Sequence, residues 1–297
     1  MEKEKKRVAL LSVFAAIFLT GFKIIVGLFT GSLGILSEAL HSALDLVAAV
    51  ITYFSVSVSD KPADREHNFG HGKVENLSAL IETLLLLITC VWIVYEALNR
   101  LISGNTQIEI TYWSYIVVIS SIIIDITRSR ALYKTAKKHN SQALEADALH
   151  FSTDIWSSAV VLLGLICAHF GFFFADSIAA LAVAVIVLTV SLKLGKRAVD
   201  VLLDKAPADV VKTVEDFLLS TPEVKDFHSL KVRASGADTF IKVNIHLDSD
   251  LELIRVHEIC DNIEKDLKSR ISRSEVYIHA EPQESSHIDS EKDLHRF

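Results

Sequence analysis

Six apolar stretches separated by short polar segments occupy the first two thirds of the chain. They lie at about residues 8–30, 33–58, 76–102, 111–133, 143–169 and 174–196. Each is near or above the ~20 residues that a helix needs to cross a bilayer. The first is too long to be a cleavable signal peptide. The pattern predicts a membrane α-helical bundle of six transmembrane helices within residues 1–204, with both termini on one side.

Beyond Arg197 the pattern changes to shorter helical and alternating runs. Residues 209–220 and 253–267 have helical periodicity, and residues 227–233, 239–247 and 275–279 read as strands. The segment 235–238 supplies the turn between the first two strands. The order αββαβ predicts a small α+β domain over residues 205–282, with its helices on one face of an open sheet. Residues 283–297 are expected to form a flexible polar tail.

Composition and charge support a membrane protein with a polar appendage. Hydrophobic residues make up 51% of 297 residues and the mean hydropathy is +0.37, which is too apolar for an ordinary soluble domain. Lys and Arg gather at one set of helix ends, whereas the opposite loops, residues 30–32, 103–112 and 169–174, contain none. The positive-inside rule therefore predicts cytoplasmic termini in an integral protein of the inner or plasma membrane. We expect the lipid bilayer as a partner, and no nucleic acid.

Two copies of the spacing His-x-x-x-Asp lie in separate apolar stretches, His41 with Asp45 and His150 with Asp154. Residues four apart share a helix face, so two such helices could supply four ligands to a tetrahedral zinc-type site. A structural hydrogen-bond network is the alternative. Ionisable groups at membrane depth are costly and usually pair or line a pathway, which favours the metal site. Imidazole and carboxylate ligands suit zinc, and also cobalt, cadmium or iron.

A second cluster lies in the loop between the second and third spans. It contains Asp64, His67 and His71, next to Gly70 and Gly72, which permit backbone bends. Three such side chains within one compact turn could bind a metal. The alternative is a solvated polar loop.

The region after the last span is acidic: residues 205–297 hold 13 Lys and Arg against 19 Asp and Glu, and six of the twelve histidines. Alternate positions on a strand share a face, so His246 is expected beside Asn244, and His279 beside Glu281. His228 lies on another strand and His257 on a helix. Because no local spacing forces these residues together, a metal site and scattered surface histidines both remain open.

Other charged residues of the spans have expected partners. Asp125 lies one helical turn before Arg128 and could pair with it, while Lys23, Glu38 and Glu82 could pair across helices or line a cavity. Asp147, three residues before His150, could orient a ligand or stabilise its helix start. None of these is predicted to be a ligand.

The chain as a whole resembles the cation diffusion facilitator family of zinc-exporting metal/proton antiporters. The resemblance covers residues 7–283 and rests on residues 37–45 (SEALHSALD), 67–73 (HNFGHGK) and 147–150 (DALH) with Asp154. It implies a homodimer whose protomers each carry the transport site His41, Asp45, His150 and Asp154. It also implies a loop metal site at Asp64, His67 and His71, and a ferredoxin-like cytoplasmic domain that binds zinc at the dimer interface.

The resemblance places His228, His257, His279 and Glu281 at the positions of the cytoplasmic zinc site. Asn244 stands where bacterial relatives often carry a histidine, and Glu281 replaces an aspartate, which leaves a two-metal cluster open; His246 on the same strand face could compensate. Lys73 resembles an interlocking lysine of the family, with Asp204 as the candidate partner. The alternative is a lysine that merely obeys the positive-inside rule.

The predicted function is zinc export from the cytoplasm by zinc/proton antiport with alternating access. Protons and metal compete for imidazole and carboxylate ligands, so a proton gradient could drive export. Zn²⁺ is then both substrate and regulatory ligand. Exporters of iron, cobalt, cadmium or manganese and a membrane zinc sensor are the alternatives. An intramembrane metalloenzyme is disfavoured because no His-Glu-x-x-His motif is present.

Overall fold

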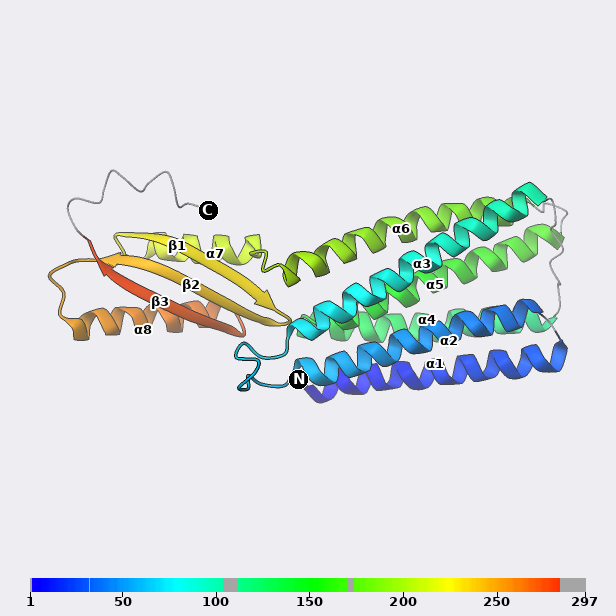
Figure 1. Cartoon of the computed structure of the whole chain (residues 1–297), viewed down its shortest axis with the longest axis horizontal. Coiled ribbons are helices and arrows are strands. Elements are labelled where there is room, and N and C mark those ends of the chain that lie inside the picture. Colours follow the sequence, from blue (N-terminus) through cyan, green and yellow to red (C-terminus); the bar gives the residue numbers. More distant parts are fainter. Residues whose placement is uncertain (1, 32, 104–111, 170–173, 284–297) are drawn as a thin grey trace. The chain divides into compact units, whose positions relative to one another are not determined.

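The computed structural model describes residues 2–31, 33–103, 112–169 and 174–283 (Figure 1). The chain divides into two compact units, Met1–Val199 and Asp200–Phe297, here called the helical unit and the αββαβ unit. The helical unit is built from α1 (Glu2–Thr30), α2 (Leu33–Ser59), α3 (Lys73–Ser103), α4 (Tyr112–His139), α5 (Gln142–His169) and α6 (Phe174–Leu202). Residues 284–297 of the predicted tail lie outside the described residues.

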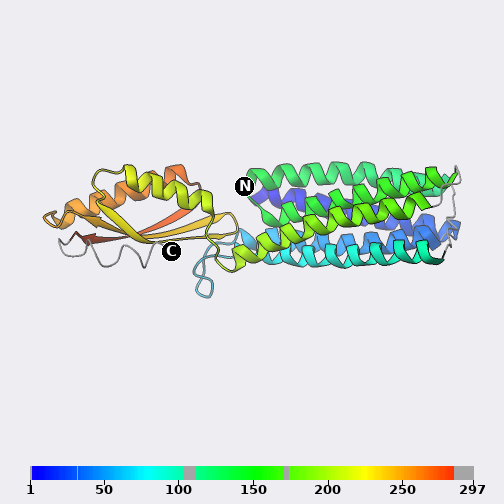
Figure 2. The ribbon, with the colours of Figure 1, turned by 90° about the horizontal axis from the view of Figure 1, so that it is seen from above.

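Small side chains set the packing of the helical unit. Helices α1, α2, α4 and α5 share a core that contains six buried alanines together with Leu132, Leu144 and Phe151. Such residues allow the close helix approach that is typical of membrane bundles. Helix α6 packs on α3 and α5 through two further apolar clusters, which centre on Leu194 and Val187. The six helices run lengthwise beside one another (Figure 2).

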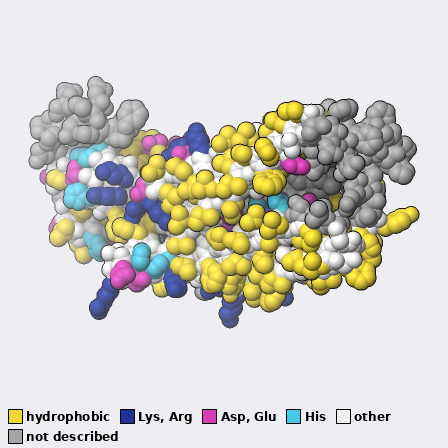
Figure 3. Space-filling model, turned by 45° about the vertical axis from the view of Figure 1, so that its right-hand side comes forward, with side chains coloured by type: hydrophobic (Ala, Val, Ile, Leu, Met, Phe, Trp, Pro, Cys, Tyr) yellow, Lys and Arg dark blue, Asp and Glu magenta, His cyan; other side chains and the backbone are white. Residues whose placement is uncertain are grey.

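The outer surface of the helical unit is strongly apolar. Large hydrophobic side chains such as Leu28, Phe29 and Val91 are each at least 70% exposed, and such side chains cover much of the helical face seen in Figure 3. By length and composition alone, three helical segments of the described chain could cross a membrane: Lys3–Thr30, Glu38–Ser59 and Lys73–Asn99. An exposed apolar surface of this extent suits contact with lipid.

A buried ion-pair cluster joins the helix ends near the N-terminus. Lys5 of α1 is 1% exposed, and its Nζ lies 2.7 Å from Asp60 Oδ1 and 3.0 Å from Glu75 Oε1. Ser59 Oγ donates to Glu75 Oε1 at 2.8 Å, and Ser141 Oγ donates to Glu75 Oε2. The cluster thus connects α1, the end of α2, the start of α3 and the turn before α5.

The second unit has the predicted αββαβ order. Helix α7 (Ala208–Ser220) precedes β1 (Asp226–Ser235) and β2 (Asp238–Leu247), and helix α8 (Leu253–Arg270) leads to β3 (Ser274–Pro282). The strand order is β1-β2-β3, with β1 antiparallel and β3 parallel to β2. Both helices cover one face of the sheet (Figure 2), because their apolar sides pack with Ile241, Val243 and Ile245 of the sheet. The predicted α+β arrangement is therefore confirmed.

Candidate metal centre

The four residues of the predicted transmembrane site meet between α2 and α5. His150 Nε2 lies 3.1 Å from Asp45 Oδ1, while His41 Nε2 and His150 Nε2 each lie 3.7 Å from an oxygen of Asp154. Ligand atoms of His41, Asp45 and Asp154 all lie within 4.8 Å of one another. These three residues thus form a group that could hold a metal ion, and His150 contacts both of its carboxylates. Imidazole and carboxylate donors of this kind suit a tetrahedral divalent metal.

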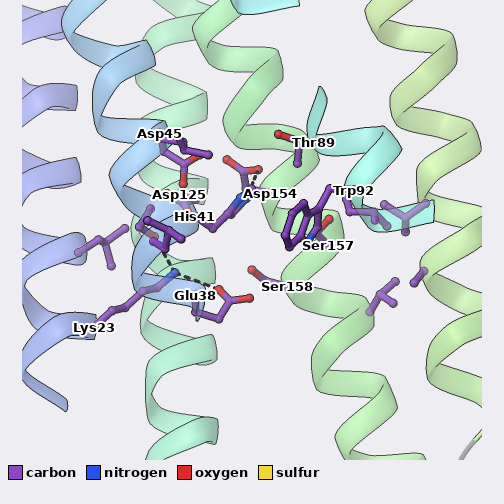
Figure 4. A pocket seen from close by; sticks show the side chains of 18 of the residues that line it. Lys23, Glu38, His41, Asp45, Thr89, Trp92, Asp125, Asp154, Ser157 and Ser158 are labelled. Carbon is purple, nitrogen blue, oxygen red and sulfur yellow. Dashed lines mark hydrogen bonds and ion pairs between the residues drawn. The ribbon is translucent and has the colours of Figure 1, made fainter. Parts of the chain in front are cut away.

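A cavity of about 450 Å³ adjoins this site (Figure 4). His41, Asp45 and Asp154 line it. The His41 side chain is 33% exposed, whereas that of His150 is 4% exposed. The cavity extends along α2 toward Glu38, whereas Thr52, farther along α2 in the opposite direction, is fully buried. The cavity therefore reaches the Glu38 side of the site, whereas α2 is buried at Thr52 on the other side.

A buried polar network centred on Arg128 supports the site from α4. Arg128 Nη1 lies 3.3 Å from Asp125 Oδ1, so the expected pair forms, and its Nη2 donates to Ser12 Oγ at 3.1 Å. The guanidinium carbon lies 3.5 Å from the centre of the Phe151 ring. Ser12 Oγ in turn donates to Asp147 Oδ2 at 3.3 Å. Sequence reasoning missed Ser12 and Phe151 because neither is charged; the only signal was that Phe151 directly follows a predicted ligand.

Lys23 and Glu38 form the expected pair across helices. Lys23 Nζ lies 3.2 Å from Glu38 Oε2 and donates to Ser42 Oγ at 2.8 Å, and both charged residues line the cavity. Glu82 is fully buried and accepts hydrogen bonds from Thr52 and Ser78. These three charged residues therefore pair across helices or line a cavity, as expected from the sequence.

The loop between α2 and α3 brings the second predicted cluster together. Asp64 Oδ1 lies 3.5 Å from His67 Nδ1, and Asp64 Oδ2 lies 3.3 Å from His71 Nε2. The backbone N–H groups of His67 and Glu66 donate to Asp64 Oδ1 at 2.7 and 2.9 Å and hold the pKa of Asp64 below its ordinary value. Gly70, at φ +73°, turns the chain between the two histidines. One cation could contact all three side chains.

In the αββαβ unit, the strand register brings Glu281 next to the histidines. His246 pairs with Glu281 in the parallel ladder of β2 and β3, and His228 pairs with Asn244 in the antiparallel ladder of β1 and β2. Glu281 Oε2 lies 3.1 Å from His228 Nε2 and 3.7 Å from His246 Nε2. Glu281 Oε1 accepts a hydrogen bond from Asn244 Nδ2 at 2.8 Å and lies 3.4 Å from His279 Nε2. The two expected face-sharing pairs therefore meet at one carboxylate.

The ionisation of Glu281 reflects these neighbours. Partial burial alone would raise the pKa of the Glu281 carboxyl, but the hydrogen bond and positive charge of His228, and the hydrogen bond from Asn244, outweigh it. The net pKa of Glu281 lies below its ordinary value. The carboxylate is therefore ionised at neutral pH and could contribute an oxygen ligand to a metal held by His228 and His246.

Two further predicted features concern residues outside this group. His257 on α8 is 68% exposed, and its Nε2 lies 3.5 Å from Asp261 Oδ2; within the described residues it is not part of the group formed by His228, His246 and Glu281. Asp204 Oδ2 lies 3.5 Å from Arg233 Nη1. Lys73 and Asp204 belong to different units, so their pairing stays a prediction.

An apolar helical unit that holds a metal-type donor set beside a cavity, followed by an αββαβ unit, defines a membrane cation transporter. Residues 9–203 match the cation efflux transmembrane domain, and residues 206–283 match the cytoplasmic domain of cation efflux proteins. The chain belongs to the cation diffusion facilitator family. It is an integral membrane transporter for the efflux of divalent cations, not an enzyme, and its C-terminal domain is cytoplasmic. The cytoplasmic match is to a dimerisation domain, which supports a homodimer.

Similar proteins match along nearly the whole chain. The cation-efflux pump FieF of Serratia proteamaculans (strain 568) is 32% identical over 284 residues, which cover 93% of this chain and 92% of the relative. The cation-efflux pump FieF of Cronobacter sakazakii is 30% identical over 277 residues, with coverages of 93% and 92%. Solved structures of CzrB, one of them a Zn form, align with 26% of this chain at 25% identity, cover 98% and 89% of their own chains, and have TM-scores of 0.26 and 0.25.

Proposed function

We propose that this chain exports zinc from the cytoplasm as a homodimer, and that each protomer exchanges Zn²⁺ for protons at His41, Asp45, His150 and Asp154. The observation that supports this proposal is the convergence of two imidazoles and two carboxylates from α2 and α5 at contacts of 3.1 to 3.7 Å. Nitrogen and oxygen ligands in this number suit tetrahedral zinc, and the lack of a thiolate disfavours copper(I).

The charges around the site support a divalent substrate. Asp125 pairs with Arg128, and Glu38 pairs with Lys23. Of these four carboxylates, Asp45 and Asp154 remain to balance the positive charge of a bound ion. The histidine ligands contribute no charge, because an imidazole that binds metal is neutral. Two carboxylates balance two positive charges, so a divalent ion can be held in the membrane interior without excess charge. Charge that is not balanced at this depth would be costly.

Proton exchange follows from the chemistry of the ligands. A metal binds ionised carboxylates and neutral imidazoles, so protons that reach the same atoms displace it. His41 lines the cavity and is the ligand most open to solvent, with 33% of its side chain exposed, so it is our candidate for the first group to be protonated. The proton gradient across the membrane would then drive metal release on the outer side.

The two cytoplasmic clusters have proposed supporting roles. Asp64, His67 and His71 bind zinc in the loop before α3. His228, His246 and Glu281 bind zinc in the αββαβ unit, with His279 beside them, and this binding tightens the dimer and favours export when cytoplasmic zinc rises. Both proposals draw on the short distances between the imidazole nitrogens and the carboxylate oxygens in each group.

The test is zinc flux into proteoliposomes that contain a pH-sensitive dye, under an imposed pH gradient. We expect zinc and protons to move in opposite directions, and Asp154→Ala to abolish both fluxes. Glu145→Ala is the matched control, because Glu145 is a carboxylate of the same helix whose partners are the more exposed Lys137 and Arg197. This variant should keep both fluxes.

Other outcomes would overturn specific parts of the proposal. Zinc binding without flux would favour a membrane sensor. Asp154-dependent flux of iron, cobalt, cadmium or manganese, in preference to zinc, would keep the transport site but change its substrate. Zinc flux that is indifferent to the pH gradient would contradict proton exchange.

A further inference from the structure

Lys23 is a cation held inside the helical unit, next to the proposed metal ligands. Its side chain is only 5% exposed, although it lines the 450 Å³ cavity. The ammonium donates to Ser42 Oγ at 2.8 Å and to Glu38 Oε2 at 3.2 Å. Ser42 directly follows His41, and Glu38 lies about one helical turn before it. A buried ammonium in this place is costly and therefore points to a function beyond packing.

Lys23 lies on the outward side of the site. The C-terminal domain is cytoplasmic, so α6 ends and α1 begins on the cytoplasmic side, and α2 runs from the outer side inward. Glu38 is then outward of His41, and Asp45 is inward of it. Figure 4 shows Lys23 and Glu38 next to each other, on the side of His41 away from Asp45. Lys23 lines the cavity on this side, so its ammonium borders the way of a metal ion that leaves toward Glu38.

A fixed positive charge at this place opposes a bound cation. Lys23 interacts electrostatically with Asp154, one of the proposed ligands. Repulsion between the ammonium and a divalent ion raises the free energy of the loaded, outward-open site, because charges in a partly buried cavity are weakly screened. Glu38 limits this repulsion, since its carboxylate holds and partly neutralises the ammonium. The pair can thus set how firmly the open site holds its metal.

We propose that Lys23 is a release-promoting residue of the transporter: its ammonium lowers the affinity of the outward-open site for divalent metal, and Glu38 holds it in position. This inference rests on the proposed transport role of His41, Asp45, His150 and Asp154. It adds a residue that binds no metal but determines how readily the metal leaves.

The experiment compares Lys23→Met, Lys23→Arg and Glu38→Gln with the unsubstituted protein. Zn²⁺ affinity is measured on purified full-length protein by competition with a chelator dye, after the signal of Asp154→Ala is subtracted to remove zinc bound at the other sites. Maximal zinc flux and the half-saturating zinc concentration are measured in proteoliposomes. Lys23→Met should bind Zn²⁺ on the order of tenfold more tightly and reach a lower maximal flux.

The conservative variants separate a release role from a structural one. Lys23→Arg keeps the charge and should retain the affinity and flux of the unsubstituted protein. Glu38→Gln frees the ammonium from its carboxylate partner and should weaken Zn²⁺ binding, opposite to Lys23→Met. A merely structural Lys23 would instead lower affinity and flux together when replaced by Met, and this result, or an unchanged affinity, overturns the inference.

The same experiment distinguishes failure of the inference from failure of the proposed function. If zinc flux survives Asp154→Ala, the proposed transport site is wrong, and the role of Lys23 is wrong with it. If flux requires Asp154 but Lys23→Met behaves like the unsubstituted protein, the transport site stands and only the role of Lys23 is overturned.

Discussion

His150 Nε2 lies 3.1 Å from Asp45 Oδ1, so the shortest contact of the proposed transport site joins α5 to α2. His150 is farther, at 3.7 Å, from Asp154, which lies four residues later on its own helix. The residues that share a motif are thus not the closest partners. The cross-helix contacts make the site dependent on the relative position of two helices, so a shift of α5 along α2 by one turn, about 5.4 Å, would break the contacts of His150 with Asp45 and of His41 with Asp154.

Asp45→Asn should strongly weaken zinc binding at this site. The amide removes a negative charge and deprives His150 of its nearer carboxylate partner, so the loss should exceed the about 10–100-fold that is typical for an outer partner of a metal ligand. Zinc titration of the purified protein measures it, and Glu145→Gln on the neighbouring helix α5 is the control. Zinc affinity equal to that of the unsubstituted protein would contradict the assignment of Asp45 as a ligand.

Arg128→Met should destabilise the helical unit. It leaves the buried carboxylate of Asp125 without its 3.3 Å partner and removes the contact with Phe151, so the free energy of unfolding should fall by about 3 kcal/mol. Thermal unfolding in detergent is the measurement. Adding Asp125→Asn should recover part of the loss, because no unpaired charge then remains; purely additive losses would show that the two residues are not coupled.

Asp64→Asn should weaken zinc binding in the loop by about tenfold across about pH 6 to 8. The effect should not vary over this range, because the lowered pKa of Asp64 keeps its carboxylate ionised throughout. Zinc titrations in an Asp154→Ala background isolate the loop from the transport site. Glu66→Gln is the control, since Glu66 is a neighbouring exposed carboxyl outside the metal-type group. A loss confined to alkaline pH would contradict the ionisation assigned to Asp64.

Glu281→Gln should destabilise the αββαβ unit at neutral pH but not in strong acid. The folded-state pKa of Glu281 lies below its ordinary value. Its contribution to stability is therefore present above the ordinary pKa of about 4.3 and is lost as the pH falls through the lower folded value. Hydrogen exchange of β3 amides in the zinc-free protein measures this, with Glu275→Gln on the same strand as control. A difference that persists in strong acid would contradict the prediction.

Asn244→His should strengthen zinc binding in the αββαβ unit. Asn244 already reaches Glu281 Oε1 at 2.8 Å, and its neighbours across the ladders are His228 and His279. An imidazole there would add a nitrogen ligand to a group that now offers His228, His246 and Glu281. We expect a gain in affinity of about tenfold, read by competition with a chelator dye. Weaker binding would show that the amide of Asn244 is needed to orient Glu281.

Local spacing in the sequence predicted which four residues lie together between α2 and α5, but not which of them make the shortest contacts. The interval of four placed His41 with Asp45 and His150 with Asp154 on their helix faces. The rotation of α2 against α5, which decides that His150 meets Asp45 first, depends on packing among residues such as Ala49, Ala148 and Phe151. These contacts are distant in sequence, and periodicity carries no information about them.

In the small sheet, too, the local sequence pattern predicted the strands, whereas contacts between residues distant in sequence determine which side chains become neighbours. Alternation and the turn at Gly236, φ +61°, were enough to predict the β1–β2 hairpin. The last strand was expected only to residue 279, but it runs to Pro282. Its backbone pairing with β2 continues through the pairs His246–Glu281 and Leu247–Pro282. That extension is what places Glu281 opposite His246. The sequence identified His246 and Glu281 as candidates, but the pairing of β2 with β3 determines that they lie side by side.

The cluster of Lys5, Asp60 and Glu75 has a consequence for how the cytoplasmic side can open. Its three charges are packed between helices, with Lys5 only 1% exposed. Separating α1 from α2 and α3 at this end would leave each charge without its partner, at a cost that only incoming water can offset. If these helix ends part during the proposed transport cycle, water must therefore enter as they separate, so that wetting and opening of this end are coupled.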